Sequence, residues 1–190
     1  MICLTCKNLS FKIICKTCQA KLLTPNFYKK EIEKDFFVYS FYEYKDLEDL
    51  IQSKYYFYGD RVFNTLAKLS FKKFATNFKF DYPILAIPID DHTRHDFSQT
   101  AILTKELKSK NITPIYNTLK ATNIVKYAGK DLEYRQKNPR KFIYSGEKNC
   151  NVILIDDVLT TGTTLLEAKK VLKKHKINVL FALTLCTFLN

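Results

Sequence analysis

The chain has 190 residues, of which 46% are hydrophobic and 26% are charged. This composition is that of a globular protein, and it excludes a largely disordered chain, a collagen, a coiled coil and an integral membrane protein. No uncharged apolar run approaches the length of about 18 residues that a membrane span needs. The formal net charge of +12 favours polyanionic partners such as nucleic acid, phosphorylated metabolites or anionic lipid, although a lysine-rich composition is also expected from an AT-rich genome.

Four of the six cysteines lie near the start of the chain, at Cys3, Cys6, Cys15 and Cys18. Each CxxC pair can supply two thiolates, and Zn²⁺ takes four such sulfurs in a closed structural site. A redox-active CxxC is the alternative, but that motif normally opens a helix after a strand within a larger core. The sequence therefore predicts a zinc module over residues 1–24, whose folding depends on the metal. Reduced cysteines and the lack of a recognisable secretory signal predict a cytoplasmic protein.

Beyond the boundary marked by Pro25, apolar and aromatic runs alternate with helical patterns. We predict, in chain order, a strand at 36–44, helices at 46–54 and 60–78, a strand at 83–89, a helix at 98–109, a strand at 112–119, a long loop with helical turns at 120–142, a strand at 152–155, a helix at 164–175 and a strand at 178–188. The alternation of strand and helix from residue 83 onward is typical of a parallel sheet with helices on both faces. The predicted fold class is thus α/β, with one domain over 25–190 whose core spans 81–190.

The clearest chemical signal follows the predicted strand at 152–155. That apolar strand leads into Asp156 and Asp157, then into a bend of small hydroxyl residues around one glycine, and then into a helix. Ligands of open α/β sheets bind at the carboxyl ends of strands, and a helix N-terminus offers free N–H groups to an anion. The candidate anion-binding residues are those of the bend, namely Thr160, Thr161, Gly162, Thr163 and Thr164. The pattern Gly-x4-Gly-Lys is absent, so this bend is not a P-loop of the Walker type.

Two adjacent carboxylates beside an anion site need an explanation, because they repel a bare phosphate. They fit a ligand that carries hydroxyl groups, or a bound cation, next to its phosphate. A ribose 5-phosphate meets this requirement if Asp156 and Asp157 accept hydrogen bonds from its 2′- and 3′-hydroxyls while the bend holds the phosphate. The alternative is a capped strand-to-helix turn that binds no ligand.

The segment 152–168 closely resembles the motif with which type I phosphoribosyltransferases bind 5-phosphoribosyl 1-pyrophosphate (PRPP). The chain resembles the competence protein F family in further features, namely the four-cysteine module, the stretch 54–60 (Lys-Tyr-Tyr-Phe-Tyr-Gly-Asp), the proline-bounded strand 83–88 and the pattern Arg135-x2-Asn138-x3-Phe142. This resemblance implies a Rossmann-like phosphoribosyltransferase core that binds PRPP with Mg²⁺. It also implies a role in handling incoming single-stranded DNA in the cytoplasm during natural transformation, with a competence helicase or other DNA-uptake proteins as partners.

Two arginines are the candidate catalytic residues that the resemblance implies. Arg135 lies in the predicted loop 120–142, which in this fold class is a flap over the substrate, and its charge would neutralise a diphosphate leaving group. A solvated flap charge is the alternative for Arg135. The Arg-Gly-Phe-Asn-Gln segment of the family is His-Asp-Phe-Ser-Gln at 95–99, so the adjacent Arg94 is the candidate to replace the missing arginine.

The aromatic stretch at 55–58 (Tyr-Tyr-Phe-Tyr) has two interpretations. Because it lies between Lys54 and Arg61, it could stack on the bases of a single-stranded nucleic acid. The interpretation we favour is that these rings pack in the core between helices. A DNA-binding module with a PRPP-sensing pocket and no turnover is accordingly the alternative to a PRPP-dependent enzyme.

Overall fold

The structure is a computed structural model, and it describes residues 1–89, 97–123, 125 and 132–189, without the side chains of Leu132, Arg135 and Gln136. The helices are α1 (Lys16–Leu22), α2 (Tyr44–Gln52), the 3-10 helix η1 (Ser53–Tyr55), α3 (Gly59–Leu69), α4 (Phe71–Asn77), α5 (Gln99–Lys105), α6 (Leu132–Lys137) and α7 (Thr163–Lys174). The strands are β1 (Tyr28–Glu33), β2 (Phe36–Glu43), β3 (Ile84–Pro88), β4 (Ile112–Pro114), β5 (Leu119–Ala121), β6 (Phe142–Tyr144), β7 (Asn151–Leu159) and β8 (Asn178–Thr187).

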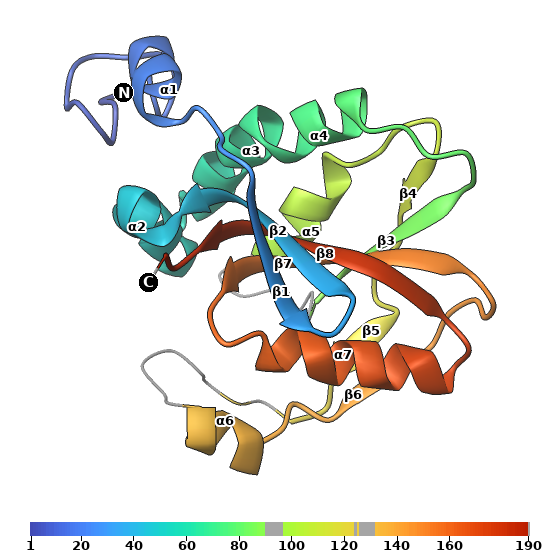
Figure 1. Ribbon diagram of the computed structural model, residues 1–190. Coiled ribbons are helices and arrows are strands. Elements are labelled where there is room, and N and C mark those ends of the chain that lie inside the picture. The colour runs from blue at the N-terminus through green and yellow to red at the C-terminus, as the bar shows by residue number, and fades with distance from the viewer. Residues whose placement is uncertain (90–96, 124, 126–131, 190) are drawn as a thin grey trace.

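A six-stranded sheet with the order β1-β2-β8-β7-β3-β4 forms the centre of the molecule (Figure 1). The neighbours from β2 to β4 all pair in parallel, and β1 pairs antiparallel with β2 at the edge. Helices α2 to α5 cover one face of the sheet and α7 covers the other (Figure 1). The prediction of an α/β fold with a mainly parallel sheet is therefore confirmed.

The two faces of the sheet are buried in two separate cores, as the side chains along β7 show. Ile153 and Ile155 belong to the core beneath α2 to α5, whereas Val152 and Leu154 belong to the core against α7. All four side chains are fully buried, which explains why this strand is apolar throughout instead of alternating with polar residues. Because successive side chains point to opposite faces, the two acidic residues that follow also lie on opposite faces.

Several elements differ from the sequence prediction. Strand β1 was not expected, because its sequence Tyr-Lys-Lys-Glu-Ile-Glu carries mostly charged side chains. The predicted helix at 60–78 is two helices, which separate at Ser70, where the hydroxyl donates a hydrogen bond to the Leu66 carbonyl at 2.7 Å. The predicted strand at 112–119 ends at Pro114, and Leu119 begins a strand that pairs antiparallel with β6 in a separate two-stranded sheet.

The N-terminal segment lies at one corner of the molecule, where α1 projects beyond α3 (Figure 1). Its connection to the main body includes the hydroxyl of buried Tyr42, which donates to the Leu23 carbonyl at 3.1 Å. Among the residues that the structure describes, no helix combines the length and the hydrophobicity needed to span a bilayer.

Candidate functional site

The four N-terminal cysteines converge on one point. Their Sγ atoms all lie within 4.8 Å of one another, and the Sγ atoms of Cys6 and Cys15 are 3.8 Å apart. A tetrahedral zinc site with Zn–S bonds of about 2.3 Å places its sulfurs about 3.8 Å from each other. The predicted four-cysteine cluster is confirmed, and its geometry fits a metal ion such as zinc.

Backbone N–H groups donate hydrogen bonds to two sulfur atoms of this cluster. The N–H of Cys15 donates to Sγ of Cys3 at 3.3 Å, and the N–H of Cys18 donates to Sγ of Cys15, which caps α1, at 3.4 Å. Burial raises the pKa of Cys3, but the hydrogen bonds from Cys15 and other backbone groups outweigh burial and lower the pKa to about 6. The hydrogen bond with the Cys15 side chain, and then burial, raise the pKa of Cys18 to about 12. A metal ion that binds all four sulfurs as thiolates must therefore displace the proton of Cys18.

The predicted anion-binding bend lies at the C-terminal edge of the parallel sheet. Strand β7 extends to Leu159, further than the sequence predicts, so Asp156 and Asp157 belong to the strand itself. Asp156 is the register partner of Thr184 in β8, and on the other side β3 ends level with Ile155. Residues 160–162 then turn the chain into α7, so both acidic residues and the helix N-terminus lie at the C-terminal edge of the sheet, where ligands of parallel sheets bind.

Gly162 gives the bend its shape. Its φ of 78° lies in the left-handed region, which glycine adopts without strain. A Cβ at this position would lie 3.0 Å from Cδ1 of Ile32 in β1, so one side of the bend packs against the protein. On the other side Thr161 is exposed, and its Oγ1 lies 2.8 Å from Oγ1 of Thr163, whose N–H also donates to it at 3.4 Å. The hydroxyl-bearing side of the bend therefore remains open to a ligand.

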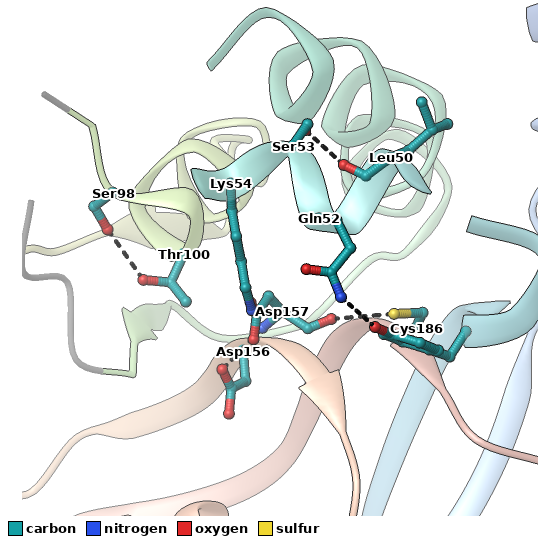
Figure 2. A network of polar contacts seen from close by, with 10 residues as sticks. Leu50, Gln52, Ser53, Lys54, Ser98, Thr100, Asp156, Asp157 and Cys186 are labelled. Atoms are coloured by element: carbon teal, nitrogen blue, oxygen red, sulfur yellow. Dashed lines mark hydrogen bonds and ion pairs between the residues drawn. The ribbon is translucent and has the colours of Figure 1, made fainter. Parts of the chain in front are cut away.

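Asp157 of the central strand β7 forms an ion pair with Lys54 of the short helix η1. The Lys54 Nζ donates to Oδ2 of Asp157 at 2.9 Å, and the two side chains are 22% and 13% exposed (Figure 2). Burial alone would raise the pKa of Asp157, but the charge and hydrogen bond of Lys54 outweigh burial and lower it. Burial alone would lower the pKa of Lys54, but the negative charge of Asp157 outweighs burial and raises this pKa. Both members of the pair are therefore ionised at neutral pH.

Asp156 lies on the opposite face of β7, and its Oδ1 accepts a hydrogen bond from the backbone N–H of Asp157 at 2.8 Å. Burial, and then the negative charge of Asp157, raise the pKa of Asp156 well above its ordinary value, although the positive charge of Arg140 opposes them. Two neighbouring carboxyl groups thus have pKa values shifted in opposite directions. Such a difference is typical of functional sites, where groups are held in unfavourable surroundings for the sake of a ligand.

This difference predicts opposite effects of two neighbouring substitutions on stability. Because the pKa of Asp156 is raised in the folded state, its carboxylate costs folding free energy above the ordinary aspartate pKa. We expect Asp156→Asn to stabilise the protein by on the order of 1 kcal/mol at about pH 8, with a gain that shrinks as the pH falls toward about 4.

Asp157→Asn is the matched control, and it should destabilise the protein at the same pH. The folded-state pKa of Asp157 is lowered, so its carboxylate contributes stability above the ordinary aspartate pKa, and that contribution is lost as the pH falls through the lowered value. Urea denaturation of both variants between about pH 5 and about pH 8 measures the two effects. Equal changes in the two variants at every pH would contradict the opposite shifts.

The structure places the two candidate catalytic arginines only in part. Arg94 lies outside the described residues, and Arg135 has its backbone in α6 while its side chain lies outside the description. Within the described part of the chain, Lys54 acts on Asp157 and Arg140 acts on Asp156. The carboxylate of Glu167 on α7 accepts the backbone N–H of Arg140 at 3.0 Å and so fixes the chain next to Asp156. Lys54 belongs to the stretch at 54–60, and Arg140 is one of only four arginines in the chain, but the positions of both beside the acidic pair depend on the fold.

The favoured interpretation of the aromatic stretch at 55–58 was wrong for three of its four rings. Tyr55, Tyr56 and Phe57 are exposed, Phe57 by 85%. Tyr58 is partly buried, and its ring lies parallel to that of Tyr56 with the centroids 5.5 Å apart. Lys54 Nζ, which pairs with Asp157, lies 5.5 Å from the ring centroid of Tyr55, so this exposed ring lies close to the ion pair.

Comparison with known proteins gives a limited similarity. No family model matches the chain, and no curated protein matches it. Among solved structures, two crystal forms of a hypoxanthine phosphoribosyltransferase from Staphylococcus aureus superpose with TM-scores of 0.41 and 0.40 at 16% sequence identity. Each match covers 66% of this chain and 62% of the other protein. At this degree of similarity the superposition does not bear on function, which depends on the residues of the site.

Proposed function

We propose that this protein is phosphoribosyltransferase-like and binds PRPP with Mg²⁺. One observation supports the proposal above all others. Two adjacent carboxyl groups of unlike pKa stand at the end of a central parallel strand, directly before an open hydroxyl-lined bend at a helix N-terminus. The acidic pair suits the hydroxyls of a sugar, and the bend suits a phosphate on the same molecule.

The assignment of the ligand groups follows from the position of each residue. The backbone N–H groups at the start of α7, with the hydroxyls of Thr160, Thr161, Thr163 and Thr164, would hold the 5-phosphate. Asp156 and Asp157 would accept hydrogen bonds from the 2′- and 3′-hydroxyls of the ribose. Gly162 would let the backbone approach the phosphate closely.

Arg135 and Arg94 are proposed to bind the diphosphate of PRPP, and Mg²⁺ would neutralise part of its charge. If the protein is an enzyme, the reaction is displacement at the ribose C1 with diphosphate as leaving group. The protein would then position the sugar and stabilise the departing charge, and no side chain need act as nucleophile. The four cysteines would hold one structural zinc ion, which leaves no open coordination position for catalysis.

Calorimetric titration of the wild-type protein with PRPP and Mg²⁺ tests this proposal. We expect saturable binding with about one site per chain, and weaker binding of ribose 5-phosphate, because the latter lacks the diphosphate. Absence of heat and of any PRPP-dependent rise in melting temperature would contradict the proposal.

A role in handling single-stranded DNA in the cytoplasm, alongside a competence helicase or other DNA-uptake proteins, is a second candidate function. It is favoured by the exposed rings of Tyr55, Tyr56 and Phe57, next to Lys54 and close in sequence to Arg61, in a chain of net charge +12. Such surfaces bind single strands by base stacking and phosphate contacts. Affinity for an oligonucleotide should fall steeply with salt and fall further in Tyr56→Ala/Phe57→Ala. No measurable binding at low salt would contradict this role.

A further inference from the structure

Lys54 reaches the acidic pair from a different layer of the molecule. It lies in η1, the short helix between α2 and α3, and is 103 residues away from Asp157 in the sequence. Figure 2 shows its extended side chain running down from η1 to the end of β7, where Nζ lies 2.9 Å from Asp157 Oδ2. With 22% and 13% of the two side chains exposed, this ion pair is largely shielded from water.

Among the residues that the structure describes, the other groups around Asp157 do not supply this positive charge. The neighbouring Asp156 is acidic, and the Cys186 thiol, 3.7 Å from the Asp157 carbonyl on the side of β8, is buried with its pKa raised by burial. Tyr55 beside Lys54 is exposed, and a phenol side chain cannot carry a positive charge. Arg140 acts on Asp156 from the α7 side of the sheet.

An acidic pair that must receive a phosphorylated sugar has an electrostatic problem. Two carboxylates at the edge of a sheet repel a ligand that carries several negative charges, and the repulsion is stronger where water is excluded. A cation bonded to one carboxylate removes much of this repulsion and also restricts the carboxylate to one orientation.

We propose that Lys54 is a positioning residue of the ribose site, which fixes the Asp157 carboxylate at the end of β7 and neutralises its negative charge. This inference rests on the proposed binding of PRPP. The inference extends the proposed function, because it assigns part of the ribose site to η1, outside the strand, bend and helix that carry the motif.

The test compares PRPP affinity, measured by calorimetry with Mg²⁺, in Lys54→Met, Lys54→Arg and Lys169→Met. Lys169 is the matched control, because its side chain is also 22% exposed and pairs with a carboxylate, that of Glu33, at 2.5 Å. We expect Lys54→Met to weaken PRPP binding about tenfold or more, Lys54→Arg to restore most of it, and Lys169→Met to leave it unchanged. Melting temperatures identify the range in which each variant is folded, and Lys54→Gln replaces Lys54→Met if the latter does not fold.

The outcomes separate this inference from the function on which it rests. If the wild type does not bind PRPP, both are wrong. If the wild type binds and Lys54→Met binds equally well, the proposed function stands and the role of Lys54 is wrong. A loss of affinity that Lys54→Arg does not restore would also overturn the inference, because it would point to a role in packing rather than in charge.

Discussion

The double substitution Asp156→Asn/Asp157→Asn is expected to weaken PRPP binding by at least about 100-fold. Each carboxylate would accept a charge-assisted hydrogen bond from a ribose hydroxyl, and such bonds contribute about 1.5–3 kcal/mol each. An amide keeps the shape of the side chain but offers one acceptor oxygen without the charge, so most of this contribution is lost. Calorimetry with PRPP and Mg²⁺ measures the change.

The matched control for this variant is Asp46→Asn/Asp49→Asn, which makes the same chemical change at two exposed positions of α2. Its affinity for PRPP should equal that of the wild type. Wild-type affinity in Asp156→Asn/Asp157→Asn would show that the ligand does not use the acidic pair. The protein would then bind PRPP elsewhere, or through the bend alone.

Loss of the metal is expected to have the second large effect. The N-terminal segment has few buried side chains of its own, namely Cys3, Ile14, Cys18 and Leu23. Zinc binding contributes about 10–16 kcal/mol to the folding of small four-ligand modules, so the segment should unfold without it. We expect about one zinc per wild-type chain, no stoichiometric zinc in Cys15→Ser, and rapid proteolysis before Pro25 in that variant.

Cys150→Ser is the control for this experiment. Cys150 is partly buried, as Cys15 is, but it lies outside the four-cysteine cluster. This variant should keep its zinc and resist the protease. Elemental analysis together with mass spectrometry of the fragments reads both quantities. A Cys15→Ser protein with the zinc content of the wild type would contradict the metal site.

The sequence predicts the parts of this molecule in which local pattern and tertiary structure agree. The run Val152 to Ile155 is apolar because both faces of β7 are buried. Gly162 immediately precedes α7, and its left-handed φ is one that glycine adopts without strain. The spacing of the cysteines predicts a single cluster because the pairs lie close together in sequence. In each case neighbouring residues carry the information that the fold uses.

The remaining features depend on contacts between distant residues. Strand β1 has a charged sequence and forms because it pairs with β2, while Glu33 binds Lys169 on α7. The partnership of Lys54 with Asp157 joins η1 to β7, and no local pattern predicts it. Phe57 is 85% exposed although large aromatic residues are more often buried, and its local sequence does not predict this exposure.

A crystal structure of the protein with PRPP and Mg²⁺ tests the central claim most directly. The 5-phosphate should lie within hydrogen-bond distance of the backbone N–H groups of Thr163 and Thr164, with the ribose hydroxyls on Asp156 and Asp157. Density for PRPP at another surface, such as among the exposed lysines, with the bend empty, would contradict the claim.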